Sequence, residues 1–145
     1  MKSAPIQSGK DIAKHHGIPL SKRSLALIKV LEAQHGAYPK PMTPSRATAP
    51  NILLYKVMDK LFAVLHIRGT EKIVFKCDPD QVLFLREHYQ GTGQHSVLDA
   101  RYWISVSHET DLSMKEMKQL VEQSYALVCQ NLTKKQQAEL AGLDK

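Results

Sequence analysis

The sequence predicts an α+β fold: an antiparallel sheet of about five strands with helices packed on one face. Three observations indicate this class. Short runs rich in β-branched and aromatic residues fill much of the chain between residues 52 and 107, as expected for strands. The connections between the first three runs are short enough for hairpins, which join antiparallel neighbours. Helix-capping signals stand at Ser21, Asp78 and Ser113.

The composition fits one folded domain with an uneven charge. Of the 145 residues, 43% are hydrophobic, a share too high for a disordered chain. The formal net charge is +6, and residues 1–51 carry all of it, with eight basic and two acidic side chains. The remaining 94 residues hold twelve side chains of each sign. The chain is therefore expected to have a neutral body and a basic N-terminal third.

The two ends of the chain carry the weakest structural signals. Residues 1–20 mix Lys, Ser, Gly and His with scattered apolar positions. We expect a basic N-terminal arm there, with at most a short helical turn. Residues 133–145 are expected to form a frayed C-terminal tail.

A first helix and a proline-rich connection are expected over residues 21–50. Ser21 is a typical N-cap residue, and the apolar residues that follow recur at helical spacing. This pattern predicts a helix over 21–35. The next segment, 37–50, contains four prolines, which forbid a helix and keep the chain extended. We expect it to be a linker or a loop that lies over the body.

Three strands open the predicted body, which spans residues 51–132. They are ILLYKV (52–57), LFAVLHI (61–67) and KIVFKC (72–77). Because their connections are short, the three strands are expected to form an antiparallel meander.

A helix is expected directly after the third strand. Asp78 is placed as the N-cap, Pro79 as the first helical residue and Gln81 as the capping-box partner. Together they predict a helix over about 79–89, which ends before Gly91.

Two further strands and a long helix complete the predicted body. The segments 95–98 and 102–107 have the composition of strands. Ser113 and Glu116 form a second capping box, which opens a helix that runs to about Leu132.

The sheet is expected to have one apolar face and one polar face. In the third strand, Ile73 and Phe75 share one face, whereas Lys72 and Lys76 share the other. Helices can cover only the apolar face, so the other face would be a solvated platform. The side chains expected on this platform are Lys72, Lys76, Trp103 and either Lys56 or Tyr55.

Membrane-spanning, secreted and disulfide-stapled classes do not fit the sequence. The longest apolar run, Leu61–Leu65, is far shorter than the roughly 20 residues of a membrane helix. The opening segment lacks the apolar stretch of a secretory signal, so we expect a cytoplasmic protein. Cys77 and Cys129 form neither a disulfide framework nor a zinc-ligand pattern, and buried thiols are expected.

The order and spacing of several short motifs resemble the MmcQ/YjbR family of small bacterial proteins. The family pattern has a Lys-Leu-Phe-Ala type strand, a Phe-Lys-Cys-x-Pro junction between a strand and a helix, a His shortly before a Trp, and a Ser-Tyr pair in the last helix. In this sequence the matching positions are Lys60–Ala63, Phe75–Pro79, His95 with Trp103, and Ser124 with Tyr125. The resemblance covers about residues 51–132.

The resemblance implies a fold similar to the frataxin/CyaY sandwich. It also implies a DNA-binding protein in which strand hairpins act as a double wing. Family members usually carry a short Pro-Phe-Gly type turn between the first helix and the first strand. Here the proline-rich segment replaces that turn, which is a departure from the family pattern.

The first functional hypothesis is nucleic-acid binding, by a monomer whose expected partner is DNA. Basic side chains on strands and hairpins would contact phosphates, Trp103 would stack on a base, and the basic arm would add phosphate contacts. Lysines on an exposed sheet face also serve simply to keep that face soluble and unpaired, so both interpretations stay open. The predicted nucleic-acid-binding residues are Lys56, Lys60, Arg68, Lys72, Lys76, His95, Arg101 and Trp103.

The alternative hypothesis is a protein-protein interaction module that uses the same sheet face. An exposed Trp103 among serines and lysines would be its aromatic anchor, because an indole ring buries a large area at a small entropic cost. Trp103 would instead be structural if it packed against the proline-rich loop. The sequence does not indicate which protein the partner would be.

The sequence indicates neither a metal site nor an enzyme. The first predicted helix is basic where hard cations would need clustered carboxylates, and His15-His16 alone is a weak metal-binding pair. His95, Ser96 and Asp99 lie close in sequence, but no nucleophile elbow, phosphate-binding loop or zinc-protease motif occurs. We therefore expect no catalytic activity and no cofactor.

Overall fold

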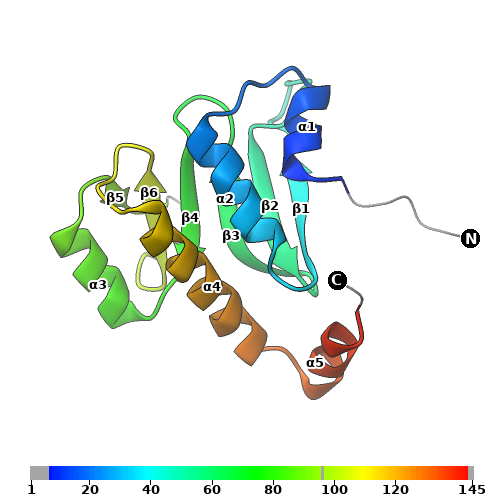
Figure 1. The fold of residues 1–145 in the computed structure, drawn as a ribbon, viewed down its shortest axis with the longest axis vertical. Helices are drawn as coiled ribbons and strands as arrows, with labels where there is room; N and C mark the ends of the chain where they lie inside the picture. Colours follow the sequence, from blue (N-terminus) through cyan, green and yellow to red (C-terminus); the bar gives the residue numbers. More distant parts are fainter. Residues whose placement is uncertain (1–6, 96, 144–145) are drawn as a thin grey trace, which may run out of the picture.

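The computed structural model describes residues 7–95 and 97–143, which form one six-stranded antiparallel sheet and five helices. The strands lie in the order β1-β2-β3-β4-β6-β5 (Figure 1). The predicted α+β class is confirmed, with one strand more than expected. The strands are β1 (Ala37–Met42), β2 (Ile52–Val57), β3 (Lys60–His66), β4 (Lys72–Lys76), β5 (Thr92–Gly93) and β6 (Trp103–Ser107). The helices are α1 (Gly9–His15), α2 (Lys22–Glu32), α3 (Pro79–His88), α4 (Met114–Gln130) and α5 (Lys134–Ala141).

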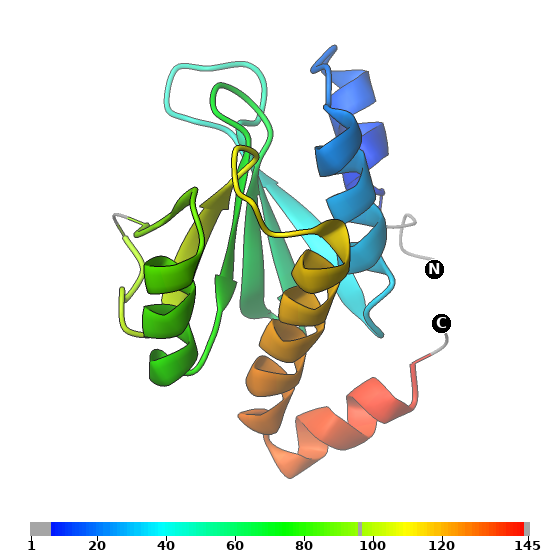
Figure 2. The same ribbon diagram turned by 60° about the vertical axis from the view of Figure 1, so that its left-hand side comes forward.

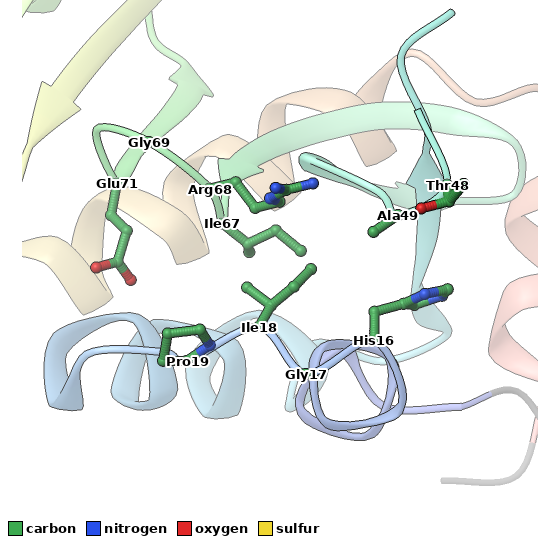
Figure 3. A pocket seen from close by; sticks show the side chains of 10 residues that line it. All are labelled: His16, Gly17, Ile18, Pro19, Thr48, Ala49, Ile67, Arg68, Gly69 and Glu71. Atoms are coloured by element: carbon green, nitrogen blue, oxygen red, sulfur yellow. The ribbon is translucent and has the colours of Figure 1, made fainter. Parts of the chain in front are cut away.

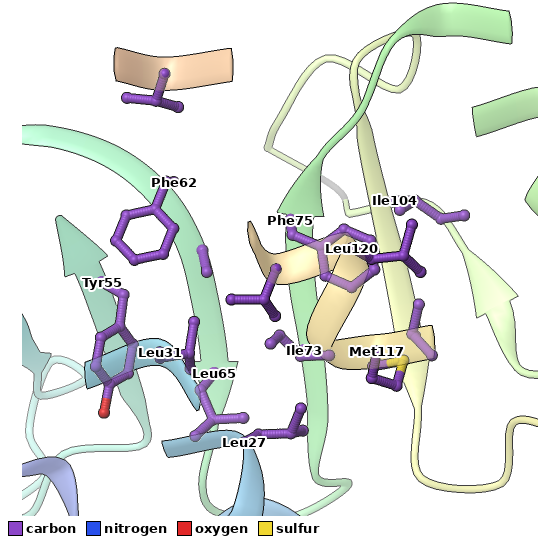
Figure 4. Packing of buried hydrophobic residues seen from close by; sticks show 14 of the residues in the cluster. Leu27, Leu31, Tyr55, Phe62, Leu65, Ile73, Phe75, Ile104, Met117 and Leu120 are labelled. Atoms are coloured by element: carbon purple, nitrogen blue, oxygen red, sulfur yellow. The ribbon is translucent and has the colours of Figure 1, made fainter. Parts of the chain in front are cut away.

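Helices α2 and α4 cover one face of the sheet. They lie on the same side of it, with α1 beside α2, as Figure 2 shows, and α3 lies beside the β5–β6 end. The core between the two layers is built from alternate strand residues and the apolar stripes of α2 and α4 (Figure 4). For example, Phe62 of β3 meets Tyr125 of α4 edge-on, with ring centroids 5.5 Å apart. The predicted antiparallel meander of β2, β3 and β4 is confirmed.

The helix caps predicted at two serines are confirmed. The Ser21 hydroxyl accepts a hydrogen bond from the Ser24 N–H at 3.1 Å, and α2 begins at the next residue. Ser113 and Glu116 form the predicted capping box, in which each side chain accepts a hydrogen bond from the backbone N–H of the other residue. Both caps satisfy N–H groups that a helix start leaves unpaired.

The capping box predicted at the start of α3 is wrong. The Asp78 side chain makes no capping hydrogen bond, although the helix begins at Pro79 as expected. The Gln81 side-chain amide instead donates to the Gln123 side chain on α4, at 2.8 Å. The glutamine therefore ties two helices together rather than closing the end of one.

The proline-rich segment contains an edge strand, so the prediction of a linker is wrong for its first half. β1 pairs with β2 over six residues, beginning with Ala37 opposite Val57. Pro39 and Pro41 are two residues apart, so their nitrogens face the same side of the strand. Because a prolyl nitrogen cannot donate a hydrogen bond, that side is the outer edge of the sheet. The edge is thereby protected against pairing with another strand.

The described part of the predicted N-terminal arm is packed on the body. The Gly9 N–H donates to the Glu32 carboxylate of α2 at 2.8 Å. A Cβ atom at Gly9 would lie 2.5 Å from the Tyr55 hydroxyl oxygen, so this close approach requires glycine. The prediction of an arm is therefore wrong for residues 9–15, which form α1, whereas residues 1–6 lie outside the described residues.

The predicted C-terminal tail contains a helix. Thr133 caps α5, and the Leu140 side chain is buried. The Leu140 carbonyl oxygen lies 2.6 Å from His35 Nε2, which fastens the helix to the turn after α2. The prediction of a frayed tail is therefore wrong for residues 134–141, and residues 144–145 lie outside the described residues.

The strand predicted at 95–98 is wrong. The described residues of this segment form no strand, and the short edge strand β5 precedes it. Ser96 lies outside the described residues, and Val97 is 84% exposed. The chain turns because the Asp99 carbonyl accepts the backbone N–H of Trp103, at 3.0 Å, and this turn leads directly into β6.

Candidate nucleic-acid interface

The sheet face opposite α2 and α4, here called the uncovered face, is defined by the strand register. Lys76 pairs with Trp103, and His66 pairs with Lys72, so these side chains share one face. On the same face, toward the β1 edge of the sheet, Tyr38 pairs with Lys56. The register places on this face Tyr38, Lys40, Met42, Ile52, Leu54, Lys56, Leu61, Val64, His66, Lys72, Val74, Lys76, Trp103, Ser105 and Ser107.

The strands of the sheet carry charge of one sign. Across all six strands, which lie entirely within the described residues, there are five lysines and no Asp or Glu. Four of these lysines, at positions 40, 56, 72 and 76, lie on the uncovered face. The carboxylates that make the body neutral are therefore on helices and connections. The net charge of the body is therefore zero although one face of its sheet is positively charged.

The centre of the uncovered face is not the solvated platform that the sequence predicts. Val64 is only 3% exposed and Val74 is fully buried, although both point away from α2 and α4. The segment between β5 and β6 lies against this face, because the His95 ring is 5.7 Å from the His66 ring between centroids. The two valines make this part of the face apolar, which gives the connecting segment a surface to pack on.

Of the two residues proposed from β2, Lys56 lies on the uncovered face and Tyr55 does not. Tyr55 is fully buried in the core. Its hydroxyl donates to the Glu32 carboxylate at 2.7 Å, which satisfies the polar end of the ring. The same carboxylate oxygen accepts the Gly9 N–H, so one acidic side chain joins α1, α2 and β2.

The YjbR family model matches residues 36–127, which is more than half of the chain. The chain belongs to the YjbR family. The match begins before β1, so the proline-rich edge strand is part of the family domain. Compared with the expected 51–132, the match starts earlier, at residue 36, and ends at 127.

Two solved structures have folds similar to that of this YjbR protein. A crystal structure of a Deinococcus radiodurans protein with a DUF419 domain has 22% sequence identity and a TM-score of 0.67, over 82% of this chain and 88% of that chain. A crystal structure of a Pseudomonas syringae protein has 20% identity and a TM-score of 0.59, over 75% of this chain and 99% of that chain. At these identities the likeness shows the fold alone. Among curated proteins, none matches the chain.

The structure brings five of the eight predicted nucleic-acid-binding residues to the uncovered face of this YjbR protein. On β4, Lys72 and Lys76 flank the buried Val74, and Lys76 lies opposite Trp103 of β6. Trp103 is itself half-buried, so it offers only part of its ring to a ligand. These five residues are Lys56, Lys72, Lys76, His95 and Trp103.

The other three predicted residues lie apart from this set. Lys60 shares the side of Val57 at the β2–β3 turn. Arg68 is exposed in the connection between β3 and β4, at the opposite end of β3. Arg101 forms a 2.8 Å ion pair with Asp99, and its guanidinium holds the pKa of that carboxyl down to about 2. The charge of Arg101 is therefore partly matched already.

Sequence reasoning missed three side chains on the uncovered face. Tyr38 and Lys40 lie in the segment that the sequence predicts to be a linker, and His66 ends β3. A signal for the first two exists in the pattern AYPKPM, because prolines at alternate positions are compatible with an edge strand. His66 is found only through its register with Lys72.

Two histidines on the uncovered face are held neutral. Burial, together with the nearby charge of Lys72, lowers the pKa of His66 to about 4. The same two causes lower the pKa of His95. His66 Nε2 is buried and has no hydrogen-bond partner among the described residues. At neutral pH the positive charge of this region therefore comes from lysine alone.

His66 predicts a loss of stability on mild acidification. Its folded pKa is depressed, so the unfolded chain takes up the proton first as pH falls below 6.5. The free energy of unfolding should therefore fall from about pH 6.5 toward about pH 4, and the H66Q variant should fall less steeply. Urea titrations at about pH 7.5 and 5.5 measure this, above the range in which carboxylates titrate. The H15Q variant, altered at an exposed position, is the control, and an equal change in both variants would contradict the assignment.

A buried serine and a histidine meet outside the uncovered face. The Ser24 hydroxyl donates to the Glu71 carboxylate at 2.6 Å and lies 2.8 Å from His108 Nε2. Because the hydroxyl proton is directed to Glu71, His108 is the donor to Ser24 rather than a base for it. Ser24 is fully buried at the start of α2, so the cluster fastens this helix to the connection before β4.

Among the described residues, both cysteines are free thiols, and there is neither a cluster of metal-ligating side chains nor a helix suited to cross a membrane. Cys77 is buried as expected, with a thiol pKa raised by burial to about 12, whereas Cys129 is only half-buried. Within residues 7–95 and 97–143, no cluster of three or more His, Cys, Asp or Glu side chains is arranged to hold a metal ion. No helix in the described part of the chain is long and apolar enough to cross a membrane.

Most of the large exposed apolar side chains lie on α3 and on the segment before β6. Leu83 and Phe84 on α3 are exposed, as are Val97 and Tyr102 on the segment before β6. The protein-interaction alternative was placed at Trp103, which is less exposed than these residues. Four of the six large apolar side chains that are exposed among the described residues therefore lie on α3 or just before β6, and the other two are Met42 and Leu143.

Proposed function

We propose that this YjbR protein binds single-stranded nucleic acid on the uncovered face of its sheet. One observation carries the proposal: the strands hold five lysines and no carboxylate, and four of the lysines lie on that face. Lysines attract a polyanion and release its counterions on binding. The same face holds aromatic rings on which bases can stack.

The shape of the sheet favours a single strand over a duplex. Six strands about 4.8 Å apart span roughly 24 Å, whereas the major groove of DNA is about 12 Å wide. The two hairpins β2–β3 and β3–β4 lie at opposite ends of β3, so they cannot enter one groove side by side. A flexible single strand can instead pass around the segment that lies on Val64 and Val74 and contact lysines on several strands.

Aromatic side chains stand next to lysines at two places on the face. Trp103 lies directly opposite Lys76 across the β4–β6 pair. Tyr38 lies opposite Lys56 across the β1–β2 pair, and its hydroxyl donates to Asp59 at 2.7 Å, which fixes the ring. A base stacked on either ring would have its phosphate within reach of the neighbouring ammonium group.

The salt dependence of binding tests this proposal. We expect a single-stranded oligothymidylate to bind the full chain more tightly than a duplex of equal length in fluorescence anisotropy titrations. Four phosphate contacts predict a log-log slope of about −2.8, which is about a 50-fold loss of affinity between about 50 and 200 mM salt. An affinity independent of salt, or no binding at about 50 mM salt, would contradict the proposal.

A further inference from the structure

Three connections meet at the end of the sheet where β3 leads into β4. Residues 16–19 join α1 to α2, residues 48–49 lie between β1 and β2, and residues 67–71 lie between β3 and β4. Together they enclose a cleft of about 540 Å³. This volume falls within the range of small-molecule sites, and loops held by a rigid scaffold are a common place for them.

The floor of the cleft is apolar. Ile67 is 1% exposed, and Ile18 points toward it from the connection between the helices, as Figure 3 shows. Gly17 and Gly69 both have a positive φ, of 67° and 72°, and a Cβ atom at either would meet no atom within 4 Å. The two turns therefore form the walls without filling the space above the isoleucines.

The polar groups of the cleft are separated by charge. In Figure 3, Glu71 stands at one end, His16 and Thr48 stand at the other, and Arg68 lies above the floor between them. Arg68 and His16 are exposed, so their side chains are free to turn toward a ligand. The cleft thus offers a carboxylate at one end and a guanidinium with an imidazole and a hydroxyl toward the other.

The carboxylate of Glu71 is fixed in position and ionised. Its Oε1 atom accepts hydrogen bonds from the Ser24 hydroxyl at 2.6 Å, the Ser21 hydroxyl at 3.1 Å and the Ser21 N–H at 3.2 Å. Burial opposes ionisation, but these hydrogen bonds outweigh it and hold the pKa of Glu71 below its usual value. Its Oε2 atom has no hydrogen-bond partner among the described residues, so it can accept a bond from a ligand.

We propose that this cleft binds a small zwitterion of the amino-acid class, with its ammonium group at Glu71 and its carboxylate at Arg68 and His16. A fixed carboxylate suits an ammonium group, and the planar fork of Arg68 suits a carboxylate. The carbon chain of the ligand would lie on Ile18 and Ile67. This site is independent of nucleic-acid binding, because it requires no contact with the uncovered face.

Isothermal titration of the full chain with simple probes tests the proposal. The probes are straight-chain amino acids from aminobutanoate to aminooctanoate, with hexylamine and hexanoate as ligands that carry one charge each. We expect at least one amino acid to bind saturably, and each singly charged probe to bind at least about tenfold more weakly. Equal binding of hexanoate and aminohexanoate, or no binding of any amino acid at about 10 mM, would overturn the proposal.

Two variants separate the ends of the site. R68Q should lower the affinity for aminohexanoate about tenfold and leave the affinity for hexylamine unchanged. E71Q should lower the affinity for aminohexanoate and for hexylamine and leave the affinity for hexanoate unchanged. The matched control is K60Q at the opposite end of β3, which should change nothing. Shifts of the Gly17 and Gly69 amide signals in NMR spectra should report binding in the cleft. Equal losses in R68Q and K60Q, or signal changes confined to another part of the fold, would overturn the assignment.

Discussion

Replacing the four lysines of the uncovered face together by Gln is expected to weaken the binding of single-stranded oligonucleotides by about 100- to 1,000-fold at about 50 mM salt. The substituted residues are Lys40, Lys56, Lys72 and Lys76. The affinity falls because each lysine that contacts a phosphate releases a counterion, and the log-log salt slope should approach zero when all four are lost. Fluorescence anisotropy titrations at several salt concentrations measure both quantities.

A second fourfold variant controls for net charge. Lys22, Lys29, Lys115 and Lys118 lie on α2 and α4, which cover the other face of the sheet. Their replacement by Gln changes the net charge by the same amount but leaves the uncovered face intact. Affinity should then fall by less than about tenfold, through long-range attraction alone. Equal losses in the two variants would show that net charge, and not this face, governs binding.

The S124A variant is expected to lower the free energy of unfolding by about 2 to 4 kcal/mol. Ser124 is fully buried on α4, where its hydroxyl donates to the Phe62 carbonyl at 2.6 Å and accepts the Lys76 N–H at 2.8 Å. The last residue pair of β3 and β4, Ala63 with Phe75, lies one residue before these two groups, beside an irregularity in β3. The hydroxyl therefore replaces a missing strand-to-strand hydrogen bond. Alanine would leave both backbone groups buried and unpaired.

Urea unfolding of the variant and of a matched serine measures this effect. Ser45 lies in the exposed connection after β1, and its replacement by Ala should change stability by less than about 0.5 kcal/mol. Because Ser124 holds the backbone of Lys76, S124A should also weaken oligonucleotide binding modestly. A stability of S124A equal to that of S45A would contradict the role assigned to this hydroxyl.

Local sequence signals predicted the centre of the fold well, because there the local and tertiary preferences agree. The strands β2, β3 and β4 alternate apolar and polar residues between short turns, and both serine caps follow standard chemistry. The elements missed depend on distant partners. β1 is a strand because it pairs with β2 at the edge of the sheet. α1 packs on the body because Gly9 fits against Tyr55, and α5 packs against His35.

The candidate interface was predictable only in part, for a similar reason. The alternation in β4 and β6 placed Lys72, Lys76 and Trp103 on one face, which the register bears out. The sequence alone could not show that Val64 and Val74 lie buried beneath the segment before β6, because the composition of that segment predicts a strand. A charge count over the whole body also could not show that no Asp or Glu lies on a strand of the sheet.

We propose that single-stranded nucleic acid lies on the uncovered face of the sheet. The most direct test of this proposal is NMR titration of the full chain with an oligothymidylate, with each backbone amide and the Trp103 indole followed separately. We expect signal changes at Lys56, Lys72, Lys76 and Trp103, with little change along α2 and α4. Changes confined to the helices, or none at concentrations that saturate binding, would contradict it.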